Sequence, residues 1–436
     1  MAKVVVVGAG WSGCAAAIGA IKAGARVTLL ERTDMLLGTG LVGGIMRNNG
    51  RFTVSEEMIS MGGGDLFHIC DLKSRHRNIE FPGHKHVSLY DIAEIHGAVL
   101  SHLDKLGIEI ILESRIEEVM MDDKTILSVK DQRERVHTGD VFIDTTGTAG
   151  PMNNCIKFGN GCAMCVLRCP SFGGRVSVGG LAGAREVVGL KPDGSIGAMS
   201  GSCKLLKESL SLEIQNQLNT KGVAIISIPE NLSVDNLEIK ACQQYALQEF
   251  KDNIILLDTS HAKLMSPYFN LENLRKIPGF ENARYEDPYT GGMGNSMRYF
   301  NMSPRDNYLR VEGVNNLFCA GEKAGLLVGH TEAIATGILA GNNSVRFALK
   351  MPLLQLPKEL AIGDAIGYVK DMMQTESGMG KKYTFSGSVY FERMLELGLY
   401  VTDIDLINKK VESLGLKGIF SQKLTEDITF NKYTAS

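Results

Sequence analysis

The chain has 436 residues, enough for two or three domains and a large core, and its hydrophobic fraction of 44% and charged fraction of 22% are those of an ordinary soluble protein. The formal net charge of −3 gives no overall attraction to nucleic acid or anionic lipid, although it leaves room for a local basic groove. The sequence has no uncharged apolar stretch of about eighteen residues, and its N-terminus reads as a strand rather than a signal peptide. We therefore expect a cytoplasmic protein that does not associate with membranes.

The first 32 residues carry the pattern of a dinucleotide-binding unit. They predict a buried strand over 4–7, a glycine-rich turn over 8–13, a helix over 14–23 and a second strand over 26–30. The glycines permit close backbone approach, so that a pyrophosphate can lie on the N-terminus of the helix. The acid after the second strand is placed to accept hydrogen bonds from ribose hydroxyls. The alternative is a glycine turn that serves packing alone. The candidate cofactor-binding residues of this unit are Gly8, Ala9, Gly10, Ser12, Gly13, Glu31 and Arg32.

Two segments that follow admit two interpretations each. Residues 38–44 are dense in glycine, and Gly43 and Gly44 could pass close to a flat cofactor ring, or the segment could be a flexible surface loop. Residues 73–86 hold several basic and histidine side chains, and we predict a loop there. It suits an anionic substrate or a second nucleotide, but a solvated charge cluster explains it as well.

The remainder of the first 150 residues alternates strands and helices. A capping-box pattern predicts a helix from Ser88 to Leu106, followed by a strand over 108–112 and a hairpin over 115–129 that turns at 122–123. A buried strand is predicted over 141–144. The small residues that follow it, Thr146 and Gly147 among them, suit close packing beside a nucleotide.

Between 151 and 300 the pattern loosens into a mixed α/β insertion. We predict helices over 203–218 and 234–250 and strands over 223–228 and 254–258. The nucleotide-domain pattern then returns as an apolar strand that ends in Gly321 and Glu322, followed by a small-residue helix over 331–349. This arrangement again places a helix N-terminus beside a polar ligand. The tail from residue 352 onward is predicted to be helical and polar.

Four cysteines fall within fifteen residues of the insertion: Cys155, Cys162, Cys165 and Cys169. Their spacing overlaps half of a bacterial ferredoxin run, so an iron–sulfur cluster that passes electrons to a flavin is the first hypothesis. A redox-active dithiol at Cys162 and Cys165, a zinc site and four unligated cysteines are the alternatives. Two further cysteines, Cys14 and Cys319, lie in apolar elements and are expected to be buried in the core.

The chain resembles the glucose-inhibited division protein A family of FAD-dependent proteins. The resemblance rests on the N-terminal fingerprint and on the segments Ile143–Gly150 and Phe318–Arg346. Within that family, the segment Leu356–Gly363 leading to Tyr368 is similar to the folate- and FAD-dependent RNA uracil-5-methyltransferases. These blocks cover about a third of the chain.

The resemblance implies a two-domain FAD-binding α/β fold of the glutathione-reductase type. Residues 1–150 and 301–350 would form the FAD-binding domain, 151–300 an inserted α/β substrate domain with the cysteine cluster, and 351–436 a helical C-terminal region. FAD would contact Gly147, Gly321, Glu322 and Thr331 besides the N-terminal residues, with Glu322 in the place of a more common aspartate. His330, just before the last nucleotide-domain helix, is the candidate catalytic residue, and a helix-capping histidine at the surface is its alternative.

The sequence and the resemblance together favour three hypotheses for the function. The first is an FAD-dependent oxidoreductase that receives electrons from NAD(P)H, or from an electron-carrier protein through the cluster, and whose substrate, a small molecule or RNA, the sequence does not identify. The second is a flavin- and folate-dependent enzyme that modifies uridines in RNA. Its relatives carry a cysteine just before a Gly-Gly in the loop after the ribose-binding acid, whereas this chain has Val42 before Gly43 and Gly44. The third is a non-catalytic FAD-binding subunit.

Overall fold

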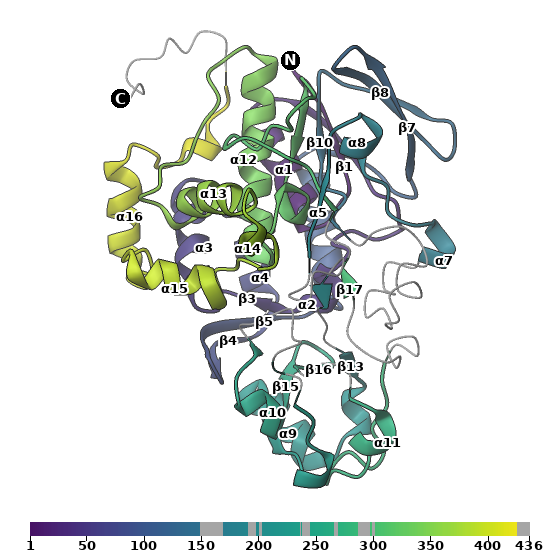
Figure 1. The fold of residues 1–436 in the computed structure, drawn as a ribbon, viewed down its shortest axis with the longest axis vertical. Helices are drawn as coiled ribbons and strands as arrows, with labels where there is room; N and C mark the ends of the chain where they lie inside the picture. The colour runs from purple at the N-terminus through teal and green to yellow at the C-terminus, as the bar shows by residue number, and fades with distance from the viewer. Residues whose placement is uncertain are drawn as a thin grey trace.

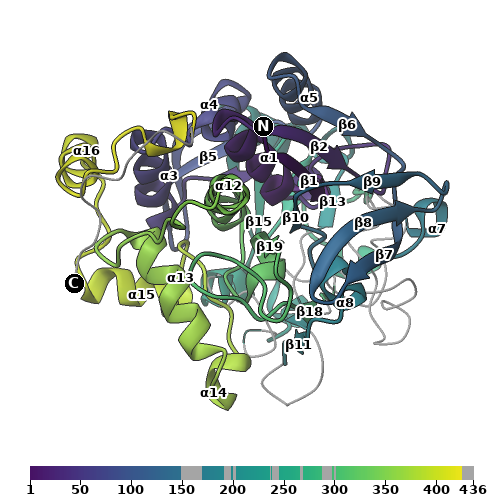
Figure 2. The ribbon, with the colours of Figure 1, turned by 90° about the horizontal axis from the view of Figure 1, so that it is seen from above.

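The computed structural model describes residues 1–148, 169–190, 198–199, 203–235, 237, 245–265, 269–286, 297–298 and 301–424. A central parallel sheet carries two long helices on one side, with an inserted lobe below it (Figure 1). The C-terminal helices and a three-stranded sheet lie on opposite sides of this centre (Figure 2). The fold is a two-domain α/β fold built on a parallel sheet, as the sequence predicts.

The central sheet has five parallel strands in the order β19-β10-β1-β2-β6. Their bounds are Leu317–Cys319, Val141–Asp144, Lys3–Val7, Arg26–Leu30 and Glu109–Ile111. The valines of β1 are buried because strands on both sides and helices cover them, which explains the continuous apolar run. The chain moves outward from β1 through β2 on one side and returns to β10 on the other. The carboxyl ends of β1 and β10 therefore flank the crevice in which such sheets bind their ligands.

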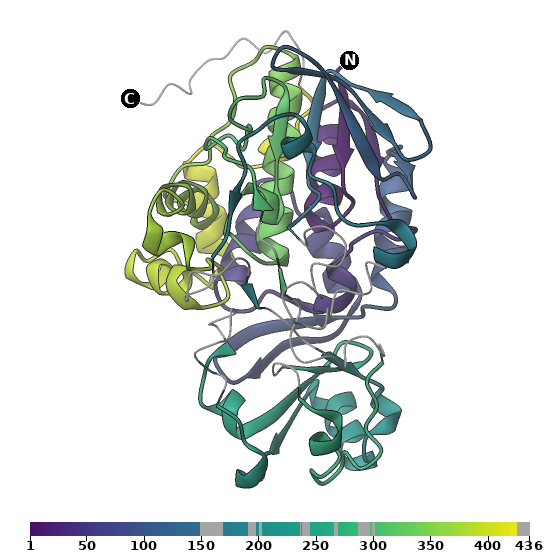
Figure 3. The ribbon, with the colours of Figure 1, turned by 45° about the vertical axis from the view of Figure 1, so that its right-hand side comes forward.

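Two helices, α1 (Trp11–Lys22) and α12 (His330–Ala348), pack side by side along this sheet (Figures 1 and 3). Small residues allow their backbones to approach closely. A Cβ on Gly19 would lie 2.6 Å from the carbonyl oxygen of Ile338, and Cβ atoms on Gly337 and Gly341 would overlap the α1 backbone. Because the two helices run in parallel, their N-termini point toward the same end of the sheet.

The inserted lobe contains an antiparallel sheet in the order β13-β16-β15-β14. It rests on a second antiparallel sheet, β3-β5-β4, which comes from the first 150 residues. The two sheets share a core, in which Ile255 and Leu257 of β15 lie with Val87 and Leu89 of β5. The bounds of these strands are Cys203–Leu205, Ala262–Leu264, Asn253–Asp258, Val223–Ser227, Ile45–Met46, His84–Tyr90 and Ser74–Phe81.

The remaining elements surround these sheets. Another three-stranded antiparallel sheet consists of β7 (Ile116–Asp122), β8 (Thr125–Asp131) and β9 (Val136–Thr138). The other helices are α2 (Gly40–Gly43), α3 (Gly50–Ser60), α4 (Asp65–Leu72), α5 (Ile95–Lys105), α7 (Cys169–Phe172), α8 (Val178–Leu181), α9 (Leu212–Lys221), α10 (Glu249–Asp252), α11 (Leu271–Leu274), α13 (Ala361–Met372), α14 (Glu376–Met379), α15 (Ser388–Glu396) and α16 (Ile404–Ser413). Short strand pairs join β11 (Val187–Val188) to β18 (Asn301–Met302) and β12 (Ala198–Met199) to β17 (Met297–Arg298). In the part of the chain described, no helix is long and apolar enough to span a bilayer.

Most of the predicted nucleotide-domain strands are confirmed. Three predicted segments are wrong, and a fourth, the helix over 234–250, is confirmed only at its end. The segment 73–86 is the hairpin β4–β5 rather than a loop, because its apolar residues face the inserted lobe. The helix predicted to begin at Ser88 begins only at Ile95, as α5, because strand β5 continues to Tyr90. The Asp91 carboxylate accepts hydrogen bonds from the N–H groups of Ala93 and Glu94, in the turn that precedes α5. The predicted helix 203–218 divides into β13 and α9, which is capped by the Ser211 hydroxyl. Only the end of the predicted helix 234–250 lies in a described helix, α10.

Candidate functional site

The crevice between β1 and β10 is built on close backbone contact. Gly8 has a positive φ of 96°, and a Cβ there would lie 2.7 Å from the carbonyl oxygen of Thr145. A Cβ on Gly13 would overlap the Gly8 carbonyl. The hydroxyl of Thr145 donates to the carbonyls of Val7 and Gly8, at 2.9 and 2.6 Å. These contacts hold the turn between β1 and α1 in one conformation.

The predicted ribose-binding acid, Glu31, lies beside this turn. One of its carboxylate oxygens accepts a hydrogen bond from the backbone N–H of Ala9 at 2.7 Å, and the other accepts from the N–H and hydroxyl of Thr33. The side chain is therefore fixed at the edge of the crevice, where its remaining acceptor positions can receive hydroxyl donors.

Gly10 differs from the other glycines of the turn because the space around it is open. It forms the N-cap of α1, and within the described ranges no side chain caps the helix and a Cβ on Gly10 would meet nothing within 4 Å. Among these residues, the backbone N–H groups of the first turn of α1 thus lack a side-chain acceptor. An anion placed there would be favoured by those donors and by the helix dipole.

The turn after β10 supplies the opposite wall. Asp144 is buried and accepts hydrogen bonds from the backbone N–H and the hydroxyl of Thr146. Its other oxygen accepts from the N–H of Gly179 at 2.9 Å. Gly147 follows with a φ of 70° and open space at its Cβ position. The predicted residues Thr146 and Gly147 therefore do lie opposite the glycine turn.

The segment after β19 lies against α1. Gly321 has a φ of 65°, and a Cβ there would be 2.7 Å from the Ser12 hydroxyl oxygen. The Glu322 carboxylate accepts a hydrogen bond from Thr148 at 2.7 Å. Ser12 also lies opposite Gly337, which comes seven residues after His330. At about 1.5 Å per residue, the N-terminus of α12 extends roughly 10 Å beyond Ser12.

His330 is the first residue of α12 and is half-buried in an aromatic cluster. Its ring lies 6.2 Å from that of Trp11 and 6.3 Å from that of Tyr90, between ring centroids. The Tyr90 hydroxyl donates to the carbonyl of Gly40 at 2.6 Å and is 3.4 Å from His330 Nδ1. Because that hydroxyl has one proton to give, we assign the proton of the neutral ring to Nδ1, with Nε2 as the acceptor.

The glycine-dense segment is the short helix α2 and its end, and it joins the two lobes. A Cβ on Gly43 would overlap the His330 ring. Gly44 has a φ of 77°, and a side chain there would overlap that of Thr259 in the inserted lobe. This segment is therefore an ordered wall between His330 and the insertion.

The ammonium group of Lys263 donates to the Val42 carbonyl at 2.8 Å, which ties strand β16 to α2. A second contact fixes the inserted lobe to strand β4. The Asp258 carboxylate of the lobe lies 3.1 Å from Arg75 and 2.9 Å from His76. Both partners are in β4, at the start of the predicted basic segment.

The basic residues of that segment are largely paired rather than gathered on one face. Lys73 forms an ion pair with Glu94 at 2.7 Å, and Arg75 reaches both Asp91 and Asp258 at 3.1 Å. Paired cations attract an external anion weakly, so this hairpin is a poor anion site.

The cysteine cluster lies mostly outside the described residues, since of its four members only Cys169 is described. The Cys169 sulfur is 4.0 Å from the Arg32 guanidinium, which also donates to the Gly173 carbonyl. Among the residues described, no group of three or more metal-ligating side chains exists. Burial raises the pKa of the thiols of Cys14, Cys70 and Cys319, the last to about 12, so these three are inert core residues.

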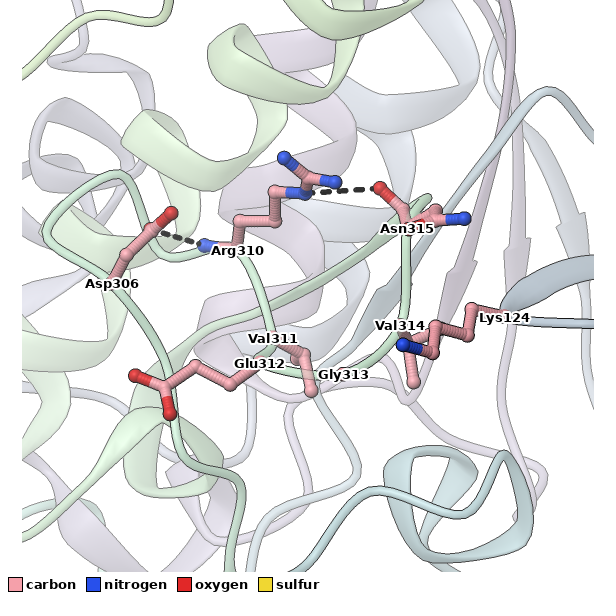
Figure 4. A pocket seen from close by; sticks show the side chains of 8 residues that line it. All are labelled: Lys124, Asp306, Arg310, Val311, Glu312, Gly313, Val314 and Asn315. Carbon is pink, nitrogen blue, oxygen red and sulfur yellow. Dashed lines mark hydrogen bonds between the residues drawn. The ribbon is translucent and has the colours of Figure 1, made fainter.

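A separate hollow of about 290 Å³ opens at the amino end of β19 (Figure 4). There Arg310 donates to the Asn315 carbonyl, and the Asp306 carboxylate accepts from the Arg310 backbone (Figure 4). Ligands in sheets of this kind bind at the carboxyl ends of the strands, so the hollow is not the candidate site. It is lined by Lys124, Asp306, Arg310, Val311, Glu312, Gly313, Val314 and Asn315.

Several residues of the site were not predicted from the sequence. Trp11 and Tyr90 are buried around His330, and Trp11 Nε1 has no hydrogen-bond partner among the described atoms. Arg51 and Glu332 form a buried ion pair at the start of α12. The sole tryptophan of the chain, placed inside the glycine turn, was an available signal. The other three come together only through folding.

The fold and this crevice define an FAD-binding α/β protein with an inserted lobe. The chain belongs to the family of glucose-inhibited division protein A, whose sequence profile matches residues 3–254 and 258–352. This result confirms the predicted family. The protein of that name from Aquifex aeolicus superposes in one crystal form with a TM-score of 0.67 at 16% identity, over 96% of this chain and 74% of that one. Members of the family are FAD-dependent enzymes.

Relatives with assigned functions align with less than a quarter of this chain. A methylenetetrahydrofolate–tRNA-(uracil-5-)-methyltransferase of Thermosipho melanesiensis is 37% identical over 106 residues, which is 23% of each chain. A tRNA uridine 5-carboxymethylaminomethyl modification enzyme of Thermus thermophilus is 35% identical over 100 residues, 22% of this chain and 15% of that one. These alignments thus span less than a quarter of either relative.

Proposed function

We propose that this chain is an FAD-dependent enzyme that modifies a uridine base in tRNA. The observation that carries the proposal is the pair of parallel helices that begin near Gly10 and at His330. Their N-termini point toward the same end of the sheet, where the insertion supplies a wall. Two relatives that align with part of this chain are named as tRNA uridine-modifying enzymes. These similarities favour the second sequence-based hypothesis over a generic oxidoreductase.

The residues of the crevice fit FAD. The pyrophosphate would lie on the first turn of α1 at Gly10, where space is open, and Glu31 would receive the ribose hydroxyls. The ribityl chain would pass Gly321, and the isoalloxazine ring would then reach the N-terminus of α12, roughly 10 Å further along by the rise of a helix. When bound, the flavin supplies the redox chemistry, with NAD(P)H as the proposed reductant.

His330 is the proposed acid–base residue of the site. Its Nδ1 faces the Tyr90 hydroxyl, and burial raises the pKa of Tyr90, which keeps that hydroxyl protonated. The His330 ring is therefore oriented by the Tyr90 hydroxyl and by Trp11, and we propose that its Nε2 takes or gives a proton at the substrate.

One feature separates this site from thiol-assisted methyl transfer. The segment before Gly43 and Gly44 has Val42 in place of a cysteine, and the described core cysteines have raised pKa values. We therefore propose a uridine modification that does not require a thiolate at this position.

The test uses unmodified transcribed tRNA, the purified FAD-loaded protein, methylenetetrahydrofolate and NADH. Digested tRNA is examined by mass spectrometry for any new uridine derivative, with His330→Ala as the matched variant. A mass increase at uridine that depends on both protein and NADH is expected. Unchanged nucleosides, together with flavin reduction by NADH, would overturn the RNA substrate.

A second candidate is an FAD-dependent oxidoreductase of a small molecule, favoured by the absence of a cysteine before Gly43. It predicts rapid flavin reduction by a nicotinamide or by an electron-carrier protein, and no effect of tRNA on reoxidation. Anaerobic stopped-flow traces recorded with and without tRNA separate the two candidates.

A further inference from the structure

A buried ion pair lies at the first turn of α12. The Arg51 guanidinium nitrogen Nε is 3.1 Å from both carboxylate oxygens of Glu332. The two side chains are 7% and 0% exposed. A pair this deep is costly to desolvate, so it is held in place only when its other hydrogen-bonding positions are filled.

Those positions are filled from two further segments. The Glu332 carboxylate also accepts from the hydroxyl of Thr384 at 2.7 Å and from the N–H of Phe385 at 2.9 Å. Arg51 donates to the side-chain oxygens of Asn48 and Thr384, at 3.1 and 3.0 Å. The pair thus ties α3, α12 and the C-terminal region together.

The pair also shapes the N-terminus of α12. Gly329, its N-cap, has a φ of 147°, and a Cβ there would overlap both the Arg51 guanidinium and the Glu332 carboxylate. Both charges therefore lie beside the N-cap, one residue from His330. The positive charge of Arg51 and the negative charge of Glu332 cancel each other. The backbone N–H groups are therefore the main source of positive potential at the N-terminus of α12.

We propose that Arg51 and Glu332 are positioning residues that set the reduction potential of the FAD. Two-electron reduction of FAD with uptake of one proton adds one negative charge to the ring system. The free energy of that charge depends on any uncompensated charge buried nearby. The balanced pair holds the potential at an intermediate value, and loss of either partner shifts it in a direction set by the charge that remains.

The experiment measures the midpoint potential of the FAD-loaded protein by anaerobic dithionite titration with a reference dye. Glu332→Gln leaves the Arg51 charge and should raise the potential. Arg51→Gln leaves the carboxylate and should lower it. We expect each shift to be about tenfold in the two-electron equilibrium constant, or about 30 mV. The double variant and Arg51→Lys should return close to the wild-type value.

If Arg51 and Glu332 had only a structural role, their two single variants would not shift the midpoint potential in opposite directions. Shifts of the same direction in both single variants, or potentials unchanged within threefold in equilibrium constant, would overturn the proposal. If Arg51→Gln does not retain FAD, Glu332→Gln decides alone, and a potential equal to or below wild type overturns it. Asp364→Asn is the matched control, because it breaks an arginine–carboxylate pair with Arg393, at 2.8 Å, within the C-terminal helices.

This inference rests on the proposed FAD site and not on the proposed substrate. If tRNA proves not to be modified, the potentials still test the ion pair. If the protein binds no FAD, the titration shows no flavin signal in any variant, and the FAD site itself fails.

Discussion

The ring of His330 fills the space that a side chain at Gly43 would need. We therefore expect Gly43→Ala to displace His330 and to disturb the flavin environment, which changes the visible absorption spectrum and lowers the rate of any flavin-dependent turnover by at least tenfold. Gly97→Ala is the control, since a Cβ at Gly97 would meet nothing within 4 Å. An unchanged spectrum and rate in Gly43→Ala would show that His330 lies away from the flavin.

A substitution at Gly10 should test FAD binding without disturbing the fold. A side chain there has open space, so Gly10→Glu should fold with the thermal stability of the FAD-free wild type. Its carboxylate would occupy the anion position at the N-terminus of α1, so that FAD is excluded. Acid extraction should release FAD from the wild type and none from the variant. Full FAD occupancy in Gly10→Glu would place the pyrophosphate elsewhere.

Glu57 makes stability depend on pH. Its buried carboxylate accepts from the N–H groups of Ala361 and Ile362, and burial raises its pKa from 4.5 to about 7. The native state therefore binds a proton that the unfolded state has released, so stability falls as pH rises from about 4.5 to 7, by up to about 3 kcal/mol. In urea unfolding at pH 5 and pH 7.5, Glu57→Gln should lack this loss. If the free energy of unfolding fell equally with pH in the wild type and in Glu57→Gln, the pH dependence could not be assigned to Glu57.

Asp258 holds the inserted lobe by charge. Its buried carboxylate lies 2.5 Å from the Lys207 ammonium and within 3.1 Å of Arg75 and His76. Asp258→Asn leaves the Lys207 and Arg75 cations without their shared carboxylate, and we expect a loss of roughly 3 kcal/mol in the free energy of unfolding. Glu118→Gln breaks an exposed pair with Lys130, which water screens, and should cost far less stability than Asp258→Asn. Equal effects of the two variants in urea unfolding would refute the role of Asp258.

The nucleotide-binding core could be predicted because its signals are local. The strand β2 and the strand β10 have the predicted bounds, since a buried parallel strand between turn residues leaves a continuous apolar run in the sequence. Gly8 and Gly13 could be assigned for the same reason, because a turn that allows no Cβ is specified by the glycines themselves.

The segments that failed are those in which a distant surface decides the structure. The polar segment 73–86 becomes a hairpin because the inserted lobe covers its apolar residues, and that lobe is more than a hundred residues away along the chain. Cys203–Leu205 pairs with β16 as a strand, although the local sequence favours a helix. Local propensity is a fraction of a kcal/mol per residue, and burial against a partner sheet outweighs it.

The glycine turn on which a cofactor can lie was predictable from the sequence, because it depends on residues within about thirty positions of one another. The family and the FAD-binding fold were recognisable because three separate blocks each carry a local pattern of this kind. What surrounds the N-terminus of α12 depends on the tertiary structure. Arg51 and Glu332 are separated by 281 positions, and no periodicity of the chain relates them. They meet because α3 and α12 are packed on one core, and a buried charge is stable only beside the opposite charge that the fold brings to it.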